Sequence, residues 1–162
     1  MQRVLVHLAA ATALTFAVGC TPSTPPPVAK PGPGAAKPGA HTHGEGPHGG
    51  ALTDWGGGAY HVEFTVDHDK KEVTVYIVGG DEKTPAPIKA SSIHLVINEP
   101  KTEMELTAKP LDGEKDGKSS RFVGTHDTIG IVQEFAGTIS GEIEGTPYTG
   151  DFKEEPHAEP KK

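Results

Sequence analysis

The chain has 162 residues, which leaves room for one ordinary globular domain with short additional segments and excludes a large multidomain enzyme. Its 22 acidic and 15 basic side chains give a formal net charge of −7, which disfavours a phosphate backbone, so we expect no nucleic-acid partner. With 21 Gly, 15 Pro and only 34% hydrophobic residues, part of the chain is expected to be unstructured.

Residues 1–19 have the pattern of a secretory signal peptide. Arg3 supplies a positive charge, and the apolar run over 4–18 is shorter than the roughly 20 residues that a transmembrane helix needs. No later segment is apolar over a comparable length. The sequence therefore predicts export of the chain and no transmembrane span in the mature protein.

Cys20 is the only cysteine, and it directly follows small and apolar residues. This arrangement resembles the lipobox of bacterial lipoproteins. The resemblance implies cleavage before Cys20, diacylglycerol on its thiol and anchoring in the cell envelope, facing the periplasm or the cell surface. Thr21 in place of Asp favours the outer membrane, by resemblance to proteobacterial sorting rules. The alternative is an ordinary secreted protein with an incidental cysteine.

The region 20–40 holds the predicted lipid anchor and a Pro-rich tether. It contains seven of the 15 prolines and no aromatic side chain, so it cannot form a core. An extended chain of this length spans up to roughly 60 Å. We expect a disordered spacer between the membrane and the domain.

A His/Gly-rich segment over 41–58 precedes the first regular alternation of apolar and polar residues. From Tyr60 onward this alternation has the period of two that is typical of strands with one buried face. No helical pattern is found. The predicted strands are 60–66, 73–77, 93–97, 104–108, 121–124, 133–143 and 148–152, the first two forming a hairpin.

About seven short strands with frequent turn signals predict an all-β domain over 59–152. We expect an antiparallel β-sandwich of immunoglobulin-like size, with a small closed barrel as the alternative. Residues 153–162 are expected to be a frayed tail.

Three histidines, His41, His43 and His48, lie within eight residues of one another. Imidazole is a common ligand of Zn and Cu, and short His-rich tracts often bind these metals. Because Cys20 is the only cysteine, a metal site must use histidine, carboxylate or backbone ligands. The alternative is a polar linker whose histidines are incidental.

The sequence Pro-His-Gly-Gly over 47–50 points more specifically to Cu(II). This ion can displace protons from the peptide nitrogens of Gly49 and Gly50 next to an anchoring His48, and Pro47 has no N–H to lose on the other side. The segment resembles the Pro-His-Gly-Gly core of the prion octarepeat, although here it occurs only once.

His61 and Glu63 are two residues apart on the strand predicted over 60–66. They are expected to share its outward face, about 7 Å from each other. A segment that folds back could place His48 above them and form a site with two histidines and one carboxylate. The alternative is a solvated strand face without a ligand.

Enzymatic activity has no support in the motifs, because we find no nucleophile elbow, phosphate-binding loop or HExxH sequence. We expect neither catalysis nor an organic cofactor. Cu(I) is also disfavoured, since the predicted mature chain offers only Met104 as a thioether ligand.

The order GPHGG, YHVEF and VTVYIVGGD resembles small uncharacterised lipoproteins of the planctomycete type. The region around 46–64 also resembles the His-Gly-Gly segments of periplasmic adaptor subunits of heavy-metal efflux pumps. These resemblances imply a sandwich domain on an envelope anchor with a link to metal.

We therefore expect a lipid-anchored envelope protein that binds Cu(II) or Zn(II) and buffers it or delivers it to a metal transporter or another envelope protein. His48, Gly49 and Gly50 are the primary candidate ligands, and His41, His43, His61 and Glu63 are the auxiliary ones. The competing hypothesis is a structural or protein-binding lipoprotein with incidental histidines.

Overall fold

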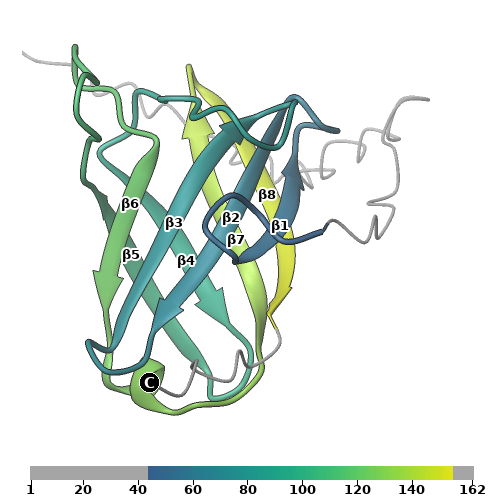
Figure 1. Ribbon diagram of the computed structural model, residues 1–162, viewed down its shortest axis with the longest axis vertical. Coiled ribbons are helices and arrows are strands. Elements are labelled where there is room, and N and C mark those ends of the chain that lie inside the picture. The colour runs from purple at the N-terminus through teal and green to yellow at the C-terminus, as the bar shows by residue number, and fades with distance from the viewer. Residues whose placement is uncertain (1–43, 155–162) are drawn as a thin grey trace, which may run out of the picture. The chain divides into compact units, whose positions relative to one another are not determined.

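The computed structural model describes residues 44–154, all of which lie within one compact unit (Figure 1). The predicted signal peptide over 1–19, the anchor and tether over 20–40, and residues 155–162 of the predicted tail lie outside this range, as do His41 and His43. Among the described residues, no helix has both the length and the apolar composition needed to cross a membrane.

Eight strands and one short 3-10 helix make up the described part of the chain. The strands are β1 (Ala51–Trp55), β2 (Tyr60–Asp67), β3 (Glu72–Gly79), β4 (Ser92–Ile97), β5 (Thr102–Ala108), β6 (Arg121–Thr125), β7 (Phe135–Ile143) and β8 (Thr146–Glu154), and the helix η1 is Asp127–Gly130.

The strands form one continuous sheet in the order β1-β2-β3-β6-β5-β4-β7-β8, and every neighbouring pair is antiparallel. This confirms the predicted all-β antiparallel class. The sheet curls until β1 lies beside β8, as the dark-blue and yellow strands of Figure 1 show. The single, nearly closed sheet is closer to the barrel alternative than to two separate layers of a sandwich.

The predicted hairpin is present as β2 and β3, joined by a turn after Asp67. Its register places Val62 opposite Ile77 and Phe64 opposite Val75, and all four side chains are buried in the core. Alternation of the side chains along a strand then directs His61 and Glu63 to the opposite, outward face of β2.

The gap between the two ends of the sheet is bridged by side chains of β1. Thr53 Oγ1 donates to the carbonyl of Asp151 in β8 at 2.7 Å, and the buried Trp55 Nε1 donates to the carbonyl of Ile139 in β7 at 3.3 Å. Trp55 also stacks against Tyr148 of β8, with ring centroids 6.0 Å apart. Because of these contacts, β1 packs against β7 and β8 as well as pairing with β2.

The structure corrects the predicted boundaries of the domain. Strand β1 lies inside the segment 41–58 that we expected to be irregular, so the sheet has eight strands, and β8 continues to Glu154. Leu52, Thr53 and Trp55 are all buried within β1. Strand β1 was overlooked because it is only five residues long and glycines flank it on both sides.

Candidate functional site

Residues 44–50, which we call the His48 loop, fold back on themselves immediately before β1. The N–H of Gly46 donates to the carbonyl of Gly50 at 2.9 Å, and the N–H of Gly49 donates to the carbonyl of Gly46 at 3.0 Å. Pro47 therefore occupies the second position of a turn, where its fixed φ is favourable. A further bridge between Glu45 and Ala51 joins the loop to β1.

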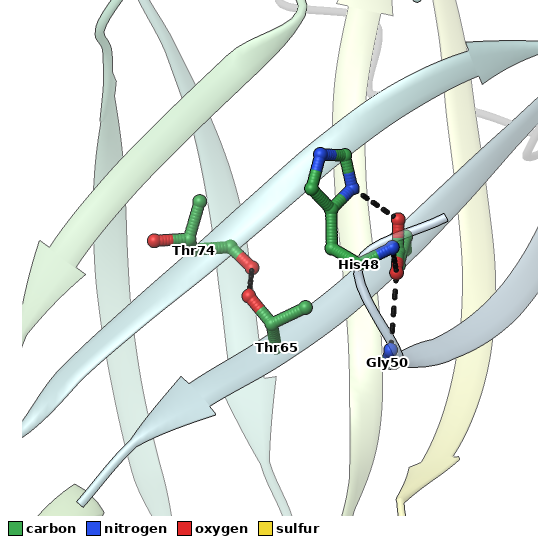
Figure 2. Close-up of polar contacts among 5 residues, drawn as sticks. His48, Gly50, Thr65 and Thr74 are labelled. Carbon is green, nitrogen blue, oxygen red and sulfur yellow. Dashed lines mark hydrogen bonds and ion pairs between the residues drawn. The ribbon is translucent and has the colours of Figure 1, made fainter. Parts of the chain in front are cut away.

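The His48 loop is fastened to β2 by the carboxylate of Glu63. Glu63 Oε1 accepts hydrogen bonds from the backbone N–H of His48 at 2.7 Å and of Gly50 at 3.0 Å, while Oε2 lies 2.8 Å from Nδ1 of the His48 ring. Figure 2 shows His48 and Gly50 directed at the same carboxylate. The side chain of Glu63 is fully buried, and these three donors compensate its loss of hydration.

Two glycines allow the loop to approach the sheet this closely. A Cβ on Gly46 would collide with the side chain of Glu63, and a Cβ on Gly50 would collide with the backbone carbonyl of Phe64. The glycines of the GEGPHGG sequence thus bring the backbone donors within reach of the carboxylate.

The ring of His48 lies flat on Tyr76, the cross-strand neighbour of Glu63 on β3. The ring centroids are 3.6 Å apart and the planes differ by 6°. Nδ1 faces a carboxylate and therefore carries a proton in both the neutral and the charged ring. Nε2 points away from Glu63 (Figure 2), and 41% of the side chain is exposed. In the neutral ring, Nε2 thus carries the lone pair.

A second carboxyl group, that of Glu154 at the end of β8, adds to the electrostatics of this region. Burial, together with the nearby charge of Glu63 as the smaller cause, raises its pKa from the ordinary 4.5 to about 8. At neutral pH Glu154 is therefore mostly protonated.

The structure brings together only part of the predicted ligand set. A segment does fold back and place His48 over Glu63, as we considered, but His61 turns to other partners. Its Nδ1 lies 3.1 Å from the carbonyl of Gly79, and its Nε2 lies 3.0 Å from Asp54 Oδ1 and 3.4 Å from Glu82 Oε1. Both His61 and Glu63 are buried, so the alternative of a solvated strand face is wrong for this pair.

The atoms of the predicted Cu(II) wrap are already engaged in hydrogen bonds. Nδ1 of His48 and the N–H of Gly50 bond to Glu63, and the N–H of Gly49 bonds to Gly46. Within residues 44–154, no cluster of three or more His, Cys, Asp or Glu side chains is arranged to hold a metal ion. The amide wrap would require the loop to leave β2. In the folded state, the ring nitrogen of His48 that remains available as a ligand is Nε2.

Sequence reasoning overlooked four residues that shape this face: Tyr76, Glu154, Asp54 and Glu82. The register of the predicted hairpin contained a signal for the first of them, because a turn at 67–71 places Tyr76 opposite Glu63. The other three depend on contacts that no local pattern indicates, between β1, β2, β8 and the loop after β3.

Comparisons of the chain with protein-family models, with curated proteins and with solved structures each give no match. The resemblances on which the lipid anchor and the metal link rest therefore stay predictions, and the function must be argued from the geometry.

Proposed function

We propose that the chain is a lipid-anchored envelope protein that binds a divalent transition metal, Zn(II) or Cu(II), through Nε2 of His48, and buffers it or delivers it to an envelope partner. The supporting observation is the 2.8 Å contact between His48 Nδ1 and the buried Glu63. Metal-binding histidines characteristically donate their other ring N–H to a carboxylate, which fixes the tautomer and raises the basicity of the ligand nitrogen.

The remaining ligands come from the chain that precedes the loop. His41 and His43 are seven and five residues before His48, close enough in sequence for their imidazoles to reach the same ion. The stacking of His48 on Tyr76 and the bonds to Glu63 hold one ligand in place before the metal arrives. This preorganisation lowers the entropic cost of binding.

The test is calorimetric titration of Zn(II) and Cu(II) into the protein at pH 7.4. We expect submicromolar binding in the unaltered protein. His48→Asn, whose amide can still donate to Glu63 while Nε2 is lost, should weaken binding at least about tenfold, and so should His41→Ala combined with His43→Ala. Glu63→Gln should weaken it by about 10- to 100-fold, as is typical for partners of metal ligands.

His94→Ala is the matched control. His94 is also 41% exposed, and its Nδ1 also lies near a carboxylate, at 3.0 Å from Glu105, but no other histidine precedes it within reach. Loss of affinity in this variant equal to that in His48→Asn contradicts the proposal. Binding no tighter than about 0.1 mM in the unaltered protein also contradicts it, and favours the structural or protein-binding alternative.

A further inference from the structure

The metal proposal leaves room for a ligand that does not belong to this chain. Zn(II) in proteins is usually four-coordinate, and sites where the metal acts on other molecules keep one position for an external group. His41, His43 and His48 together supply three imidazoles. The outward face of the sheet beside His48 offers a positive charge that suits an anionic group in the remaining position.

That positive charge is Arg121, which begins β6. Arg121 is the direct cross-strand partner of Tyr76, and Glu63 is the partner of Tyr76 on its other side. Because Phe122 is buried in the core, alternation directs Arg121 to the outward face. The Cβ atoms of such partners lie about 5 Å apart. Glu63, Tyr76 and Arg121 thus form one row across β2, β3 and β6, and the His48 ring lies on the middle of it.

The two charged ends of this row differ in how they are satisfied. Three donors of the His48 loop engage the carboxylate of Glu63. The guanidinium of Arg121 uses only Nε, which donates to the carbonyl of Lys109 at 3.0 Å, and no carboxylate within residues 44–154 pairs with it. Its terminal N–H groups therefore remain for a ligand, while the bond from Nε restrains the plane of the fork that they form.

Lys109 adds a second positive charge at this end of the row. Its N–H donates to the carbonyl of Arg121 at 2.8 Å, and its side chain is exposed. Lys70, Lys71 and Lys153 each lie within 3.2 Å of a carboxylate, whereas no carboxylate in the described part of the chain pairs with Lys109. An anion that binds here meets two positive charges that the fold does not neutralise.

The ring of His48 directs its ligand nitrogen to the same side. Figure 2 shows Nε2 on the side of the ring away from Glu63, toward β6, the pale-green strand at the left. A metal ion on Nε2 therefore lies on the β6 side of Tyr76, where Arg121 is placed. A carboxylate has two oxygens, so one can bind the ion while the other accepts hydrogen bonds from a guanidinium.

We propose that Arg121 and Lys109 bind a carboxylate of an external ligand that completes the coordination of the ion held by His48. The inference rests on the proposed metal function and names the ligand class of that site. A small organic acid and an acidic side chain of the envelope partner present the same carboxylate. Because the external ligand binds both the ion and the protein, it can arrive or leave together with the ion, which provides a route for uptake and delivery.

The test is calorimetric titration of malonate, a small dicarboxylate, into the protein with and without one equivalent of Zn(II) at pH 7.4. We expect malonate to bind the zinc-loaded protein at least about tenfold more tightly than the metal-free protein, without releasing zinc. Arg121→Gln, whose amide can still donate to the Lys109 carbonyl, should weaken malonate binding to the zinc-loaded protein at least about tenfold, the scale of one charge-assisted pair. Its affinity for Zn(II) alone should be nearly unchanged. Arg121→Lys should restore part of the loss.

Lys101→Gln is the matched control. It removes one positive charge from a side chain that is 79% exposed and directly precedes β5, whereas Lys109 directly follows β5. This variant should bind malonate as the unaltered protein does. Equal losses in Lys101→Gln and Arg121→Gln would mean that malonate responds to net charge alone, which overturns the inference.

The remaining outcomes separate this inference from the metal function. Malonate that strips zinc from the protein, or binds equally with and without zinc, overturns the external ligand and leaves zinc binding intact. Absence of zinc binding contradicts both proposals. A hexaglutamate peptide at the same carboxylate concentration distinguishes the two sources: stronger binding of the peptide to the zinc-loaded protein assigns the carboxylate to a protein partner, and stronger binding of malonate assigns it to a small acid.

Discussion

At the scale of single residues, the most unusual feature is a fully buried carboxylate whose donors come from a loop. Glu63 lies on an outward strand face, where a charged residue normally meets solvent, and its burial is produced by a segment about 15 residues earlier in the chain. Local alternation predicts the direction of the side chain correctly. It cannot predict that the His48 loop buries this side chain, because the contact joins residues 15 positions apart.

Glu154 gives the residue-scale prediction. Its pKa is about 8 in the folded protein against an ordinary 4.5, so between these values the unfolded chain releases a proton that the folded chain retains. Stability contributed by this proton is fully present below pH 4.5 and is lost as the pH rises toward 8. We expect the unfolding free energy of Glu154→Gln, relative to that of the unaltered protein, to increase by about 2 kcal/mol as the pH rises from 5 to 8.

The measurement is urea unfolding at several pH values across this range, with the difference between variant and unaltered protein plotted against pH. Glu103→Gln, at a side chain 56% exposed, is the control and should give a flat difference. A flat difference for Glu154→Gln as well would contradict the raised pKa.

At the scale of elements, strand β1 depends on the loop before it. The first residue of β1 follows Gly50 directly, and Gly50 is pressed against the backbone of β2 while its N–H bonds to Glu63. Gly50→Ala should therefore displace the His48 loop and the start of β1 together. We expect a loss of about 2–3 kcal/mol in unfolding free energy, measured by urea denaturation, from steric strain and a buried carboxylate that loses a donor.

Gly44→Ala is the matched control for this substitution, because a Cβ at Gly44 meets no atom within 4 Å. It should change the unfolding free energy by less than about 0.5 kcal/mol. Equal effects of the two substitutions would show that the loop does not hold β1.

The strands differ in how readily the sequence predicts them. Strands β2, β3 and β4 alternate strongly over six to eight residues, and their bounds follow from that pattern to within two residues. Strand β1 has five residues, and Leu52 and Thr53 are buried side by side in it. Thr53 is buried because β1 packs against β8, where the hydroxyl of Thr53 donates to the carbonyl of Asp151, and this contact is not local.

In the candidate site, too, the local sequence predicts some features, while others depend on long-range contacts. The sequence GPHGG indicates a turn with close backbone approach, and the outward direction of Glu63 follows from strand alternation. The pairing of these two features, and the separation of His61 into its own cluster with Asp54 and Glu82, required the three-dimensional arrangement.

At the scale of the whole folded unit, one core joins both ends of the sheet. Phe64 of β2 stacks on Phe152 of β8 at 4.1 Å between ring centroids, and Trp55 of β1 bonds to β7. We therefore expect the sheet to unfold in a single cooperative transition. Fluorescence of Trp55, the only tryptophan, and far-ultraviolet circular dichroism should give the same midpoint in urea.

Thr53→Val probes the junction of β1 and β8 within this unit. It removes the hydroxyl that donates to Asp151, and we expect the common midpoint to fall by an amount equivalent to about 1 kcal/mol while the two signals remain coincident. A separate, earlier fluorescence transition in either protein would mean that β1 unfolds apart from the rest.

The position of the His48 loop also has a mechanical consequence. Tension that reaches Glu45 from the preceding chain acts first on the bridge to Ala51 and on the bond between Gly46 and Gly50. Antiparallel contacts loaded from one end break one after another, as a zipper opens, and not all together. Under load the chain therefore peels His48 off Tyr76 before the pairing of β1 with β2 breaks, so a pull from the N-terminal side opens the His48 loop while the sheet stays folded.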